Sequence, residues 1–207
     1  MRLGILVSGR GSNLEAVLTA VADGRLPVVD PALVIANHSG IRALEVAARH
    51  AVPSRVMPRS AFHDPEARDA ALGQALRDDG CELVLLAGYD QILLPPYFNA
   101  FPGRTINIHP SLLPRHGGRG MVGEAVHAAV LAAGDHETGV TIHEVTAALD
   151  AGPTISQVRL PVNAGESAAD LAERVLAIEH QALVEVLAQL SASMTAGPPA
   201  PIHARRP

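Results

Sequence analysis

Three polar residues, Asn107, His109 and Asp150, have the types and spacing that acyl transfer requires. Asn107 and His109 stand two positions apart after an apolar stretch, so an extended backbone projects both side chains the same way. Asp150 lies in a separate turn. An amide can donate to an oxyanion, an imidazole can manage a proton, and a carboxylate can hold and charge the imidazole. The alternative is that these residues have only structural roles. Asn107 would then end a strand, His109 would pack beneath a proline loop, and Asp150 would be an ordinary turn residue.

A glycine-rich segment, Ser8–Asn13, lies between an apolar stretch and a helix-forming one. Backbone N–H groups at a helix N-terminus bind anions, so Gly11, Ser12 and Asn13 are expected to bind a phosphate. Leu14 replaces the third glycine of a dinucleotide loop, and no Gly-Lys-Ser/Thr triplet is present. A monophosphate is therefore expected rather than NAD or ATP. The alternative is a tight turn followed by a helix cap.

The elements that must position these residues follow from alternating apolar and helix-period segments, which predict an α/β fold with a doubly wound, mostly parallel sheet. The expected strands of the first half are Leu3–Val7, Ala32–Asn37, Ser54–Met57, Leu83–Ala87 and Thr105–Asn107. The expected helices there are Leu14–Ala22, Ile41–His50 and Asp64–Asp78. Two later stretches, Thr138–Val145 and Thr154–Leu160, should add antiparallel or mixed strands to one edge. A last helix is expected from Ser167 to about Leu190.

Composition limits the classes of function. A chain of 207 residues with 48% apolar content suits one domain, expected over residues 1–193, with a disordered Pro/Ala-rich tail at 194–207. The net charge of −5 provides no basic surface for nucleic acid or lipid. The single cysteine, Cys81, fits a reducing compartment. The first apolar run is too short for a signal peptide or a membrane span, so a cytoplasmic protein is expected.

Together these motifs resemble the folate-dependent phosphoribosylglycinamide formyltransferases of purine synthesis, from Leu3 to about Leu190. The Asn-x-His-Pro-Ser-Leu-Leu-Pro element at 107–114 indicates the wider folate formyltransferase group. The Ser-Gly-x-Gly-Ser-Asn loop narrows it to the ribonucleotide branch. Other matching segments are Leu86–Tyr89, Thr138–His143, Leu149–Pro153 and Glu179-His180. The resemblance implies the family's Rossmann-like fold and transfer of a formyl group from 10-formyltetrahydrofolate, its co-substrate, to the amine of 5'-phosphoribosylglycinamide.

The resemblance also implies residue roles. Asn107, His109 and Asp150 match the catalytic trio, in which Asn107 and a protonated His109 stabilise the oxyanion and Asp150 raises the pKa of His109. The residues that match the phosphate loop are Gly11, Ser12 and Asn13. Glu179 matches a contact to glycinamide, and His143 is expected to support the trio rather than to catalyse. The positions that match the folate pocket are Gly88, Tyr89, Asp90, Gln91, Ile92, Leu93 and Val145.

Two features depart from the commoner pattern. Asp90-Gln91 stands where many relatives carry Met-Arg, so an arginine contact to the folate tail is lost. The loop Arg115–Met121 is richer in glycine than usual and is interpreted as a mobile cover.

Other functions stay open at this point. The acceptor could be another small amine such as that of a nucleotide sugar, or the chain could hydrolyse formyltetrahydrofolate. A phosphosugar-binding module would use only the glycine loop. No His-Glu-x-x-His or His-x-His pattern occurs among the ten histidines, so no metal is expected. Small-molecule substrates and a monomer or homodimer are expected.

Overall fold

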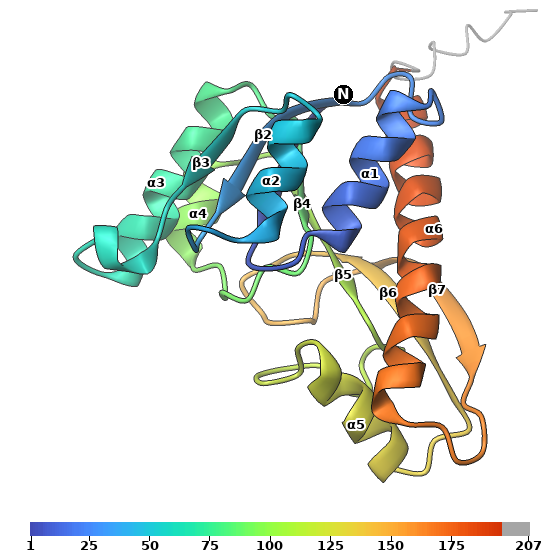
Figure 1. The fold of residues 1–207 in the computed structure, drawn as a ribbon. Coiled ribbons are helices and arrows are strands. Elements are labelled where there is room, and N and C mark those ends of the chain that lie inside the picture. The colour runs from blue at the N-terminus through green and yellow to red at the C-terminus, as the bar shows by residue number, and fades with distance from the viewer. Residues whose placement is uncertain (196–207) are drawn as a thin grey trace, which may run out of the picture.

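The computed structural model describes residues 1–195, so positions 196–207 of the expected tail lie outside the described residues. The expected α/β fold is confirmed, with a seven-stranded sheet in the order β3-β2-β1-β4-β5-β6-β7 (Figure 1). The strands are β1 (Arg2–Val7), β2 (Asp30–Ala36), β3 (Ser54–Val56), β4 (Leu83–Leu86), β5 (Arg104–His109), β6 (Glu137–Glu144) and β7 (Thr154–Pro161). The helices are α1 (Ser12–Ala22), α2 (Arg42–Arg49), α3 (Pro65–Asp78), α4 (Pro95–Ala100), α5 (Glu124–Ala132) and α6 (Ala168–Thr195).

The sheet has two parts that differ in strand direction. Strands β1 to β5 run parallel, whereas β6 is antiparallel to β5 and β7 is antiparallel to β6. The mixed edge expected for the second half is therefore confirmed. Strand β5 extends to His109, two residues beyond its expected end, so Asn107 and His109 both lie on regular extended backbone.

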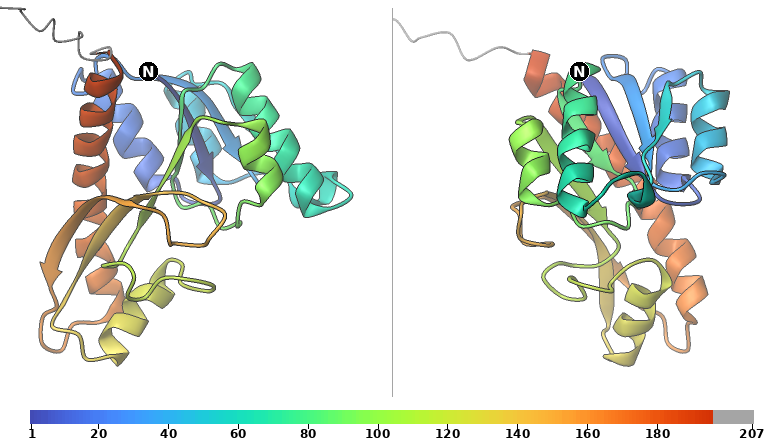
Figure 2. Two further views of the ribbon diagram at one scale, coloured as in Figure 1. Left: turned by 180° about the vertical axis from the view of Figure 1, so that it is seen from behind. Right: turned by 90° about the vertical axis from the view of Figure 1, so that its left-hand side faces the viewer.

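Helices cover both faces of the sheet (Figure 2). Helices α1, α2, α5 and α6 pack on one face, and α3 and α4 pack on the other. The sequence reasoning missed α4 and α5, as well as a short 3-10 helix at Arg59–Ala61. It also ended the last helix too early, because α6 continues to Thr195 and includes two residues assigned to the tail. No helix within residues 1–195 is long and apolar enough to cross a membrane.

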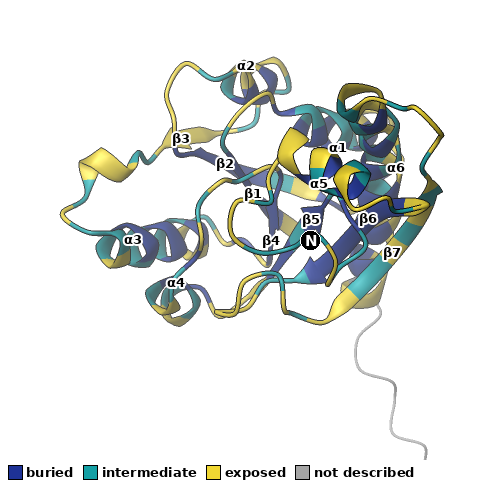
Figure 3. Cartoon of the chain, turned by 90° about the horizontal axis from the view of Figure 1, so that it is seen from below, coloured by how far each residue is buried: buried dark blue, intermediate teal, exposed yellow. Residues whose placement is uncertain are grey.

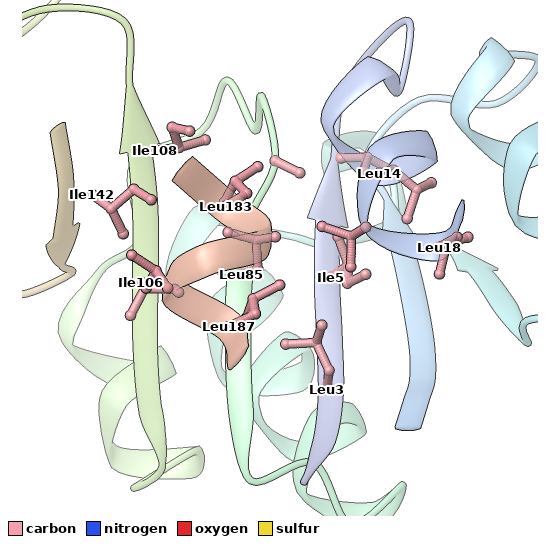
Figure 4. Close-up of a cluster of buried hydrophobic side chains, with 14 of the residues drawn as sticks. Leu3, Ile5, Leu14, Leu18, Leu85, Ile106, Ile108, Ile142, Leu183 and Leu187 are labelled. Atoms are coloured by element: carbon pink, nitrogen blue, oxygen red, sulfur yellow. The ribbon is translucent and has the colours of Figure 1, made fainter. Parts of the chain in front are cut away.

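The core follows from the alternation of side chains along the strands. Ile5 on β1 packs toward α1 and α6, whereas its neighbour Leu6 packs toward α3 and α4. On the first face, Leu85 and Ile106 meet Leu183 of α6 (Figure 4). Each such fully buried side chain contributes about 1.5–3 kcal/mol relative to exposure. Burial is concentrated in the inner strands and the inner helix faces, whereas the edge strands β3 and β7 and the connecting loops are largely exposed or only partly buried (Figure 3).

The topology determines where polar loops meet. Strands β1 and β4 are neighbours, but β1 leads to α1 on one face and β4 leads to α4 on the other. Ligands of open α/β sheets bind at such a reversal, beside the carboxyl ends of the strands. The glycine loop follows β1, the Gly88–Leu93 segment follows β4, and Asn107 and His109 end β5. These three groups of expected site residues therefore lie at the edge where the fold favours a ligand.

Candidate active site

Asn107 and His143 face each other across the β5–β6 pair, where they are directly opposite in the antiparallel register. The Nδ2 atom of Asn107 lies 3.2 Å from Nε2 of His143. The His143 Nδ1 atom donates to the backbone oxygen of Glu144 at 2.9 Å, so Nε2 is the nitrogen left to accept from the amide. This contact fixes the orientation of the Asn107 amide and leaves its second N–H free to donate.

Asp150 lies beside this pair, in the loop between β6 and β7. Its Oδ1 atom is 3.7 Å from Nε2 of His143, and its Oδ2 atom accepts from the backbone N–H of Gly118 at 2.8 Å. Its backbone has a φ of 50°, in the region that non-glycine residues rarely adopt. Residues held in such an unfavourable backbone conformation cluster at functional sites, where the conformation sets the direction of the side chain.

His109 has a different partner from the one expected. Its Nε2 atom donates to the backbone oxygen of His116 at 2.8 Å, and no hydrogen bond to Asp150 is present among the described contacts. Because a carbonyl only accepts, Nε2 carries the proton and Nδ1 is the nitrogen that can exchange one. His109 is 4% exposed. The site thus presents a buried imidazole with a defined tautomer.

The protonation state of His109 differs from the imidazolium that the sequence analysis expected. Burial lowers the pKa of His109 below its ordinary value. This effect outweighs the hydrogen bond to His116 and the negative charge of Asp150, which both raise the pKa. The expectation that Asp150 keeps His109 as an imidazolium in the resting site is therefore wrong. A neutral imidazole near pH 7 is suited to accept a proton.

The glycine loop turns directly into α1. Gly11 has a φ of 74°, and a Cβ atom there would lie 2.8 Å from the Cα atom of Ala43 on α2. Glycine is therefore required at this position by packing as well as by backbone conformation. The first N–H groups of α1, which begins at Ser12, have no acceptor within the helix. These N–H groups are where the sequence predicts a bound anion, and that role stays a prediction.

Asn13 and Glu179 meet although 166 positions separate them. Asn13 Nδ2 donates to Glu179 Oε2 at 3.3 Å, and both residues are less than 10% exposed. Burial raises the pKa of Glu179 to about 7, and the hydrogen bond from Asn13 lowers it only in part. The Oδ1 atom of Asn13 is buried without a partner. No hydrogen bond or ion pair within residues 1–195 joins these two residues to the Asn107 group.

The segment after β4 is held by polar contacts around Asp90. Its carboxylate accepts from Ser8 at 3.1 Å and from Asn37 at 2.6 Å, and it also contacts His38 and the neighbouring Gln91. Burial raises the pKa of Asp90, but these hydrogen bonds outweigh it and leave the pKa below its ordinary value. Asp90 is therefore an ionised clamp between the loops that follow β1, β2 and β4.

Gln91 is also occupied within the protein. Its Oε1 atom accepts from Nη1 of Arg68 at 2.9 Å, and the buried Arg68 pairs with Asp69. An arginine is thus present beside position 91, although it comes from α3. Tyr89 is half-buried, and its partial removal from water raises its pKa to about 12 and keeps its hydroxyl protonated.

Two cavities lie near the expected binding segments, and neither is lined by Asn107, His109 or Asp150. A groove of about 740 Å³ runs between α1 and α6 beside Ser12. A smaller cavity of about 280 Å³ is lined by Asn37, Arg59 and Gln91, among others. The loop Arg115–Met121 contacts both His109 and Asp150 through backbone groups. The expectation that this loop is a mobile cover stays a prediction.

The similarities to known proteins fit this geometry. Residues 1–187 match the model of the formyl transferase family. The chain belongs to that family. A phosphoribosylglycinamide formyltransferase of Escherichia coli (strain K12) is 37% identical over 180 residues, which cover 87% of this chain and 82% of that protein. A crystal structure of glycinamide ribonucleotide transformylase 1 from Symbiobacterium toebii has a TM-score of 0.87 and 39% identity, covering 93% of this chain and 88% of that one.

Formyl transferase domains of this kind also occur within longer proteins. A trifunctional purine biosynthetic protein adenosine-3 of Drosophila pseudoobscura pseudoobscura is 37% identical over 191 residues. Those residues cover 92% of this chain but only 14% of that relative's length. The similarity to this relative is therefore confined to a small part of it.

The sequence reasoning missed several residues that contact this candidate site. The His116 carbonyl and the Gly118 N–H hold His109 and Asp150, and the side chain of His116 contacts Asp135 at 2.7 Å. The glycine-rich composition of 117–120 was the available signal, but it does not show which backbone groups point inward. Within residues 1–195, no group of three or more His, Cys, Asp or Glu side chains is placed to hold a metal ion. The expectation of a metal-free site stays a prediction.

Proposed function

We propose that this chain transfers the formyl group of 10-formyltetrahydrofolate to the amine of 5'-phosphoribosylglycinamide. The observation that carries the proposal is the convergence of Asn107, His109 and Asp150 at the carboxyl end of β5, where one loop contacts both His109 and Asp150. The E. coli phosphoribosylglycinamide formyltransferase and the Symbiobacterium toebii glycinamide ribonucleotide transformylase, to which the chain is similar, support the same acceptor. We further propose one domain over residues 1–193 and a cytoplasmic location.

The substrate phosphate binds at the start of α1, where the backbone N–H groups of Gly11, Ser12 and Asn13 and the helix dipole favour an anion. Glu179 contacts the glycinamide part. Its pKa of about 7 allows either protonation state near neutral pH, so it can donate or accept a hydrogen bond there. The unpartnered Oδ1 atom of Asn13 is an additional acceptor for a donor on the substrate.

The folate binds beside the segment that follows β4. Its pocket comprises backbone and side chains of Gly88, Tyr89, Asp90, Gln91, Ile92 and Leu93, together with Val145. Asp90 fixes this segment through its contacts to Ser8 and Asn37. The pterin-binding edge is therefore held rigid before the substrate arrives.

The acceptor amine attacks the formyl carbon and forms a tetrahedral intermediate whose oxygen carries negative charge. The free N–H of Asn107 donates to this oxygen. His109 accepts a proton from the attacking nitrogen at Nδ1, and the imidazolium is stabilised by Asp150. It then returns the proton to N10 of the folate as the carbon–nitrogen bond breaks, so formyl transfer is complete without net proton release.

The direct test mixes the protein with 10-formyltetrahydrofolate and 5'-phosphoribosylglycinamide and follows both tetrahydrofolate release and the formylated product. We expect both to appear at equal rates and only when the acceptor is present. Tetrahydrofolate release without the acceptor would indicate a hydrolase. Transfer only to another amine, such as that of a nucleotide sugar, would show that the acceptor is a different molecule. Binding of the phosphosugar without any turnover would indicate a phosphosugar-binding module instead of an enzyme.

A further inference from the structure

The two ionisable members of the site, His109 and Asp150, are held by one short segment. The backbone oxygen of His116 accepts from His109 Nε2 at 2.8 Å, and the backbone N–H of Gly118 donates to Asp150 at 2.8 Å. The tautomer of His109 and the direction of the Asp150 carboxylate therefore both depend on the backbone of residues 116–118. Any shift of this segment changes both groups together.

This segment needs an anchor because its backbone conformation is unfavourable. His116 has a φ of 53°, which costs free energy for a residue with a Cβ atom, and Gly118 has a φ of 94°. The neighbouring glycines, Gly117 and Gly120, add conformational freedom rather than stiffness. The chain would not keep this shape through local preference alone.

Asp135 provides the anchor from the turn between α5 and β6. Its side chain is 7% exposed and accepts from Nε2 of His116 at 2.7 Å and from the guanidinium of Arg115. The two donors are adjacent in sequence, so one carboxylate fixes the start of the segment at two points. Asp135 itself makes no described contact with His109, Asp150 or Asn107.

We propose that Asp135 is a positioning residue for the reaction: through Arg115 and His116 it holds the 116–118 backbone so that His109 keeps its proton on Nε2. The same connection keeps the Gly118 N–H on Asp150. The inference rests on the proposed function for its effect on turnover, but its effect on the tautomer of His109 can be observed without any substrate.

The experiment compares the parent with Asp135→Asn, which removes the charge at nearly constant size. The tautomer of His109 is read from long-range ¹H–¹⁵N correlations of ¹⁵N-histidine protein, with the signal assigned by a His109→Asn variant. We expect the parent to show the Nε2–H form and the variant to show a mixture. We also expect kcat to fall about tenfold or more with KM within about twofold, since a misplacement on the order of 1 Å can cost on the order of 10²-fold.

Two further variants make the result decisive. Glu137→Gln is the matched control. Glu137 lies two residues from Asp135 but pairs with Arg159, so the loss of its charge should change neither the tautomer of His109 nor kcat. His116→Gly favours the positive φ but loses the side-chain contact to Asp135, so we expect it to resemble Asp135→Asn. An unchanged tautomer in both Asp135→Asn and His116→Gly would overturn the proposal. A parent that transfers no formyl group would instead defeat the proposed function while leaving the tautomer result valid.

Discussion

Asp90 and Asp150 both lie in loops beside the sheet edge, but their carboxylates have different surroundings. Asp90 accepts from Ser8, Asn37 and Gln91 and contacts His38, and these contacts lower its pKa. Asp150 accepts one described hydrogen bond, from Gly118, and lies 3.7 Å from His143. A carboxylate whose oxygens are already occupied serves as a clamp, whereas one with free acceptor capacity can respond to a proton nearby.

The largest expected effect is that of Asp150→Asn on turnover. The charge of Asp150 raises the pKa of His109, so its loss should lower that pKa further below the ordinary value of about 6.5 and weaken proton transfer. We expect kcat to fall on the order of 10³-fold, within the range of about 10²–10⁴ that general acid–base catalysis contributes. Rates measured across pH, with an NMR titration of His109, test this. A His109 pKa that rises in the variant would contradict the assignment.

The second largest effect is expected for Asn107→Ala. Its kcat should fall on the order of 10²–10³-fold, which is the usual cost of losing one oxyanion donor. Asn37→Ala is the matched control, because Asn37 is buried and contacts Asp90 rather than the reacting groups. It should reduce the free energy of unfolding while kcat changes little. Equal losses of kcat in both variants would remove the distinction between clamp and catalytic group.

Glu179→Gln should change the pH dependence of stability. Like Asp90, Glu179 accepts from an asparagine, but deep burial raises its pKa to about 7, so the parent loses stability as pH rises from about 4.5 to 7. The variant lacks this loss. We therefore expect the unfolding free energy of the variant minus that of the parent to increase by on the order of 2–3 kcal/mol between about pH 4.5 and about pH 8.5. Urea unfolding at both pH values measures it. Parallel pH profiles would show that Glu179 is not protonated in the folded state.

Asp90→Asn should have the smallest effect. Because Asp90 is partly exposed, we expect a loss of only about 0.5–1 kcal/mol in unfolding free energy at pH 7. Because Asp90 lines the proposed folate pocket, KM for the folate should rise while kcat at saturating folate stays nearly unchanged. A lowered folded-state pKa means that this contribution is present above about pH 4 and disappears as pH falls further. Thermal unfolding from pH 3 to 7 follows it. A large loss of kcat would place Asp90 in the reaction rather than in the clamp.

The sequence alone determined the sheet and most of its bounds, since apolar alternation depends on which residues are excluded from water. Strand β1 and helix α3 were predicted to within two residues. Helix α5 was missed, although Val126 and Val130 are spaced four apart on its buried side. The glycine loop and the Asn-x-His pair were also visible, because their spacing along one segment fixes their relative direction.

Only the tertiary structure decided which groups share a contact. Spacing cannot show that Asn13 reaches Glu179, or that β6 places His143 opposite Asn107, because strand order and register set those distances. The resting charge of His109 was likewise mispredicted: a pKa depends on the balance between desolvation and neighbouring charges, and burial prevails over Asp150 here. Backbone groups such as the His116 carbonyl carry no signature in the sequence, since every residue has one and only the fold gives it a direction.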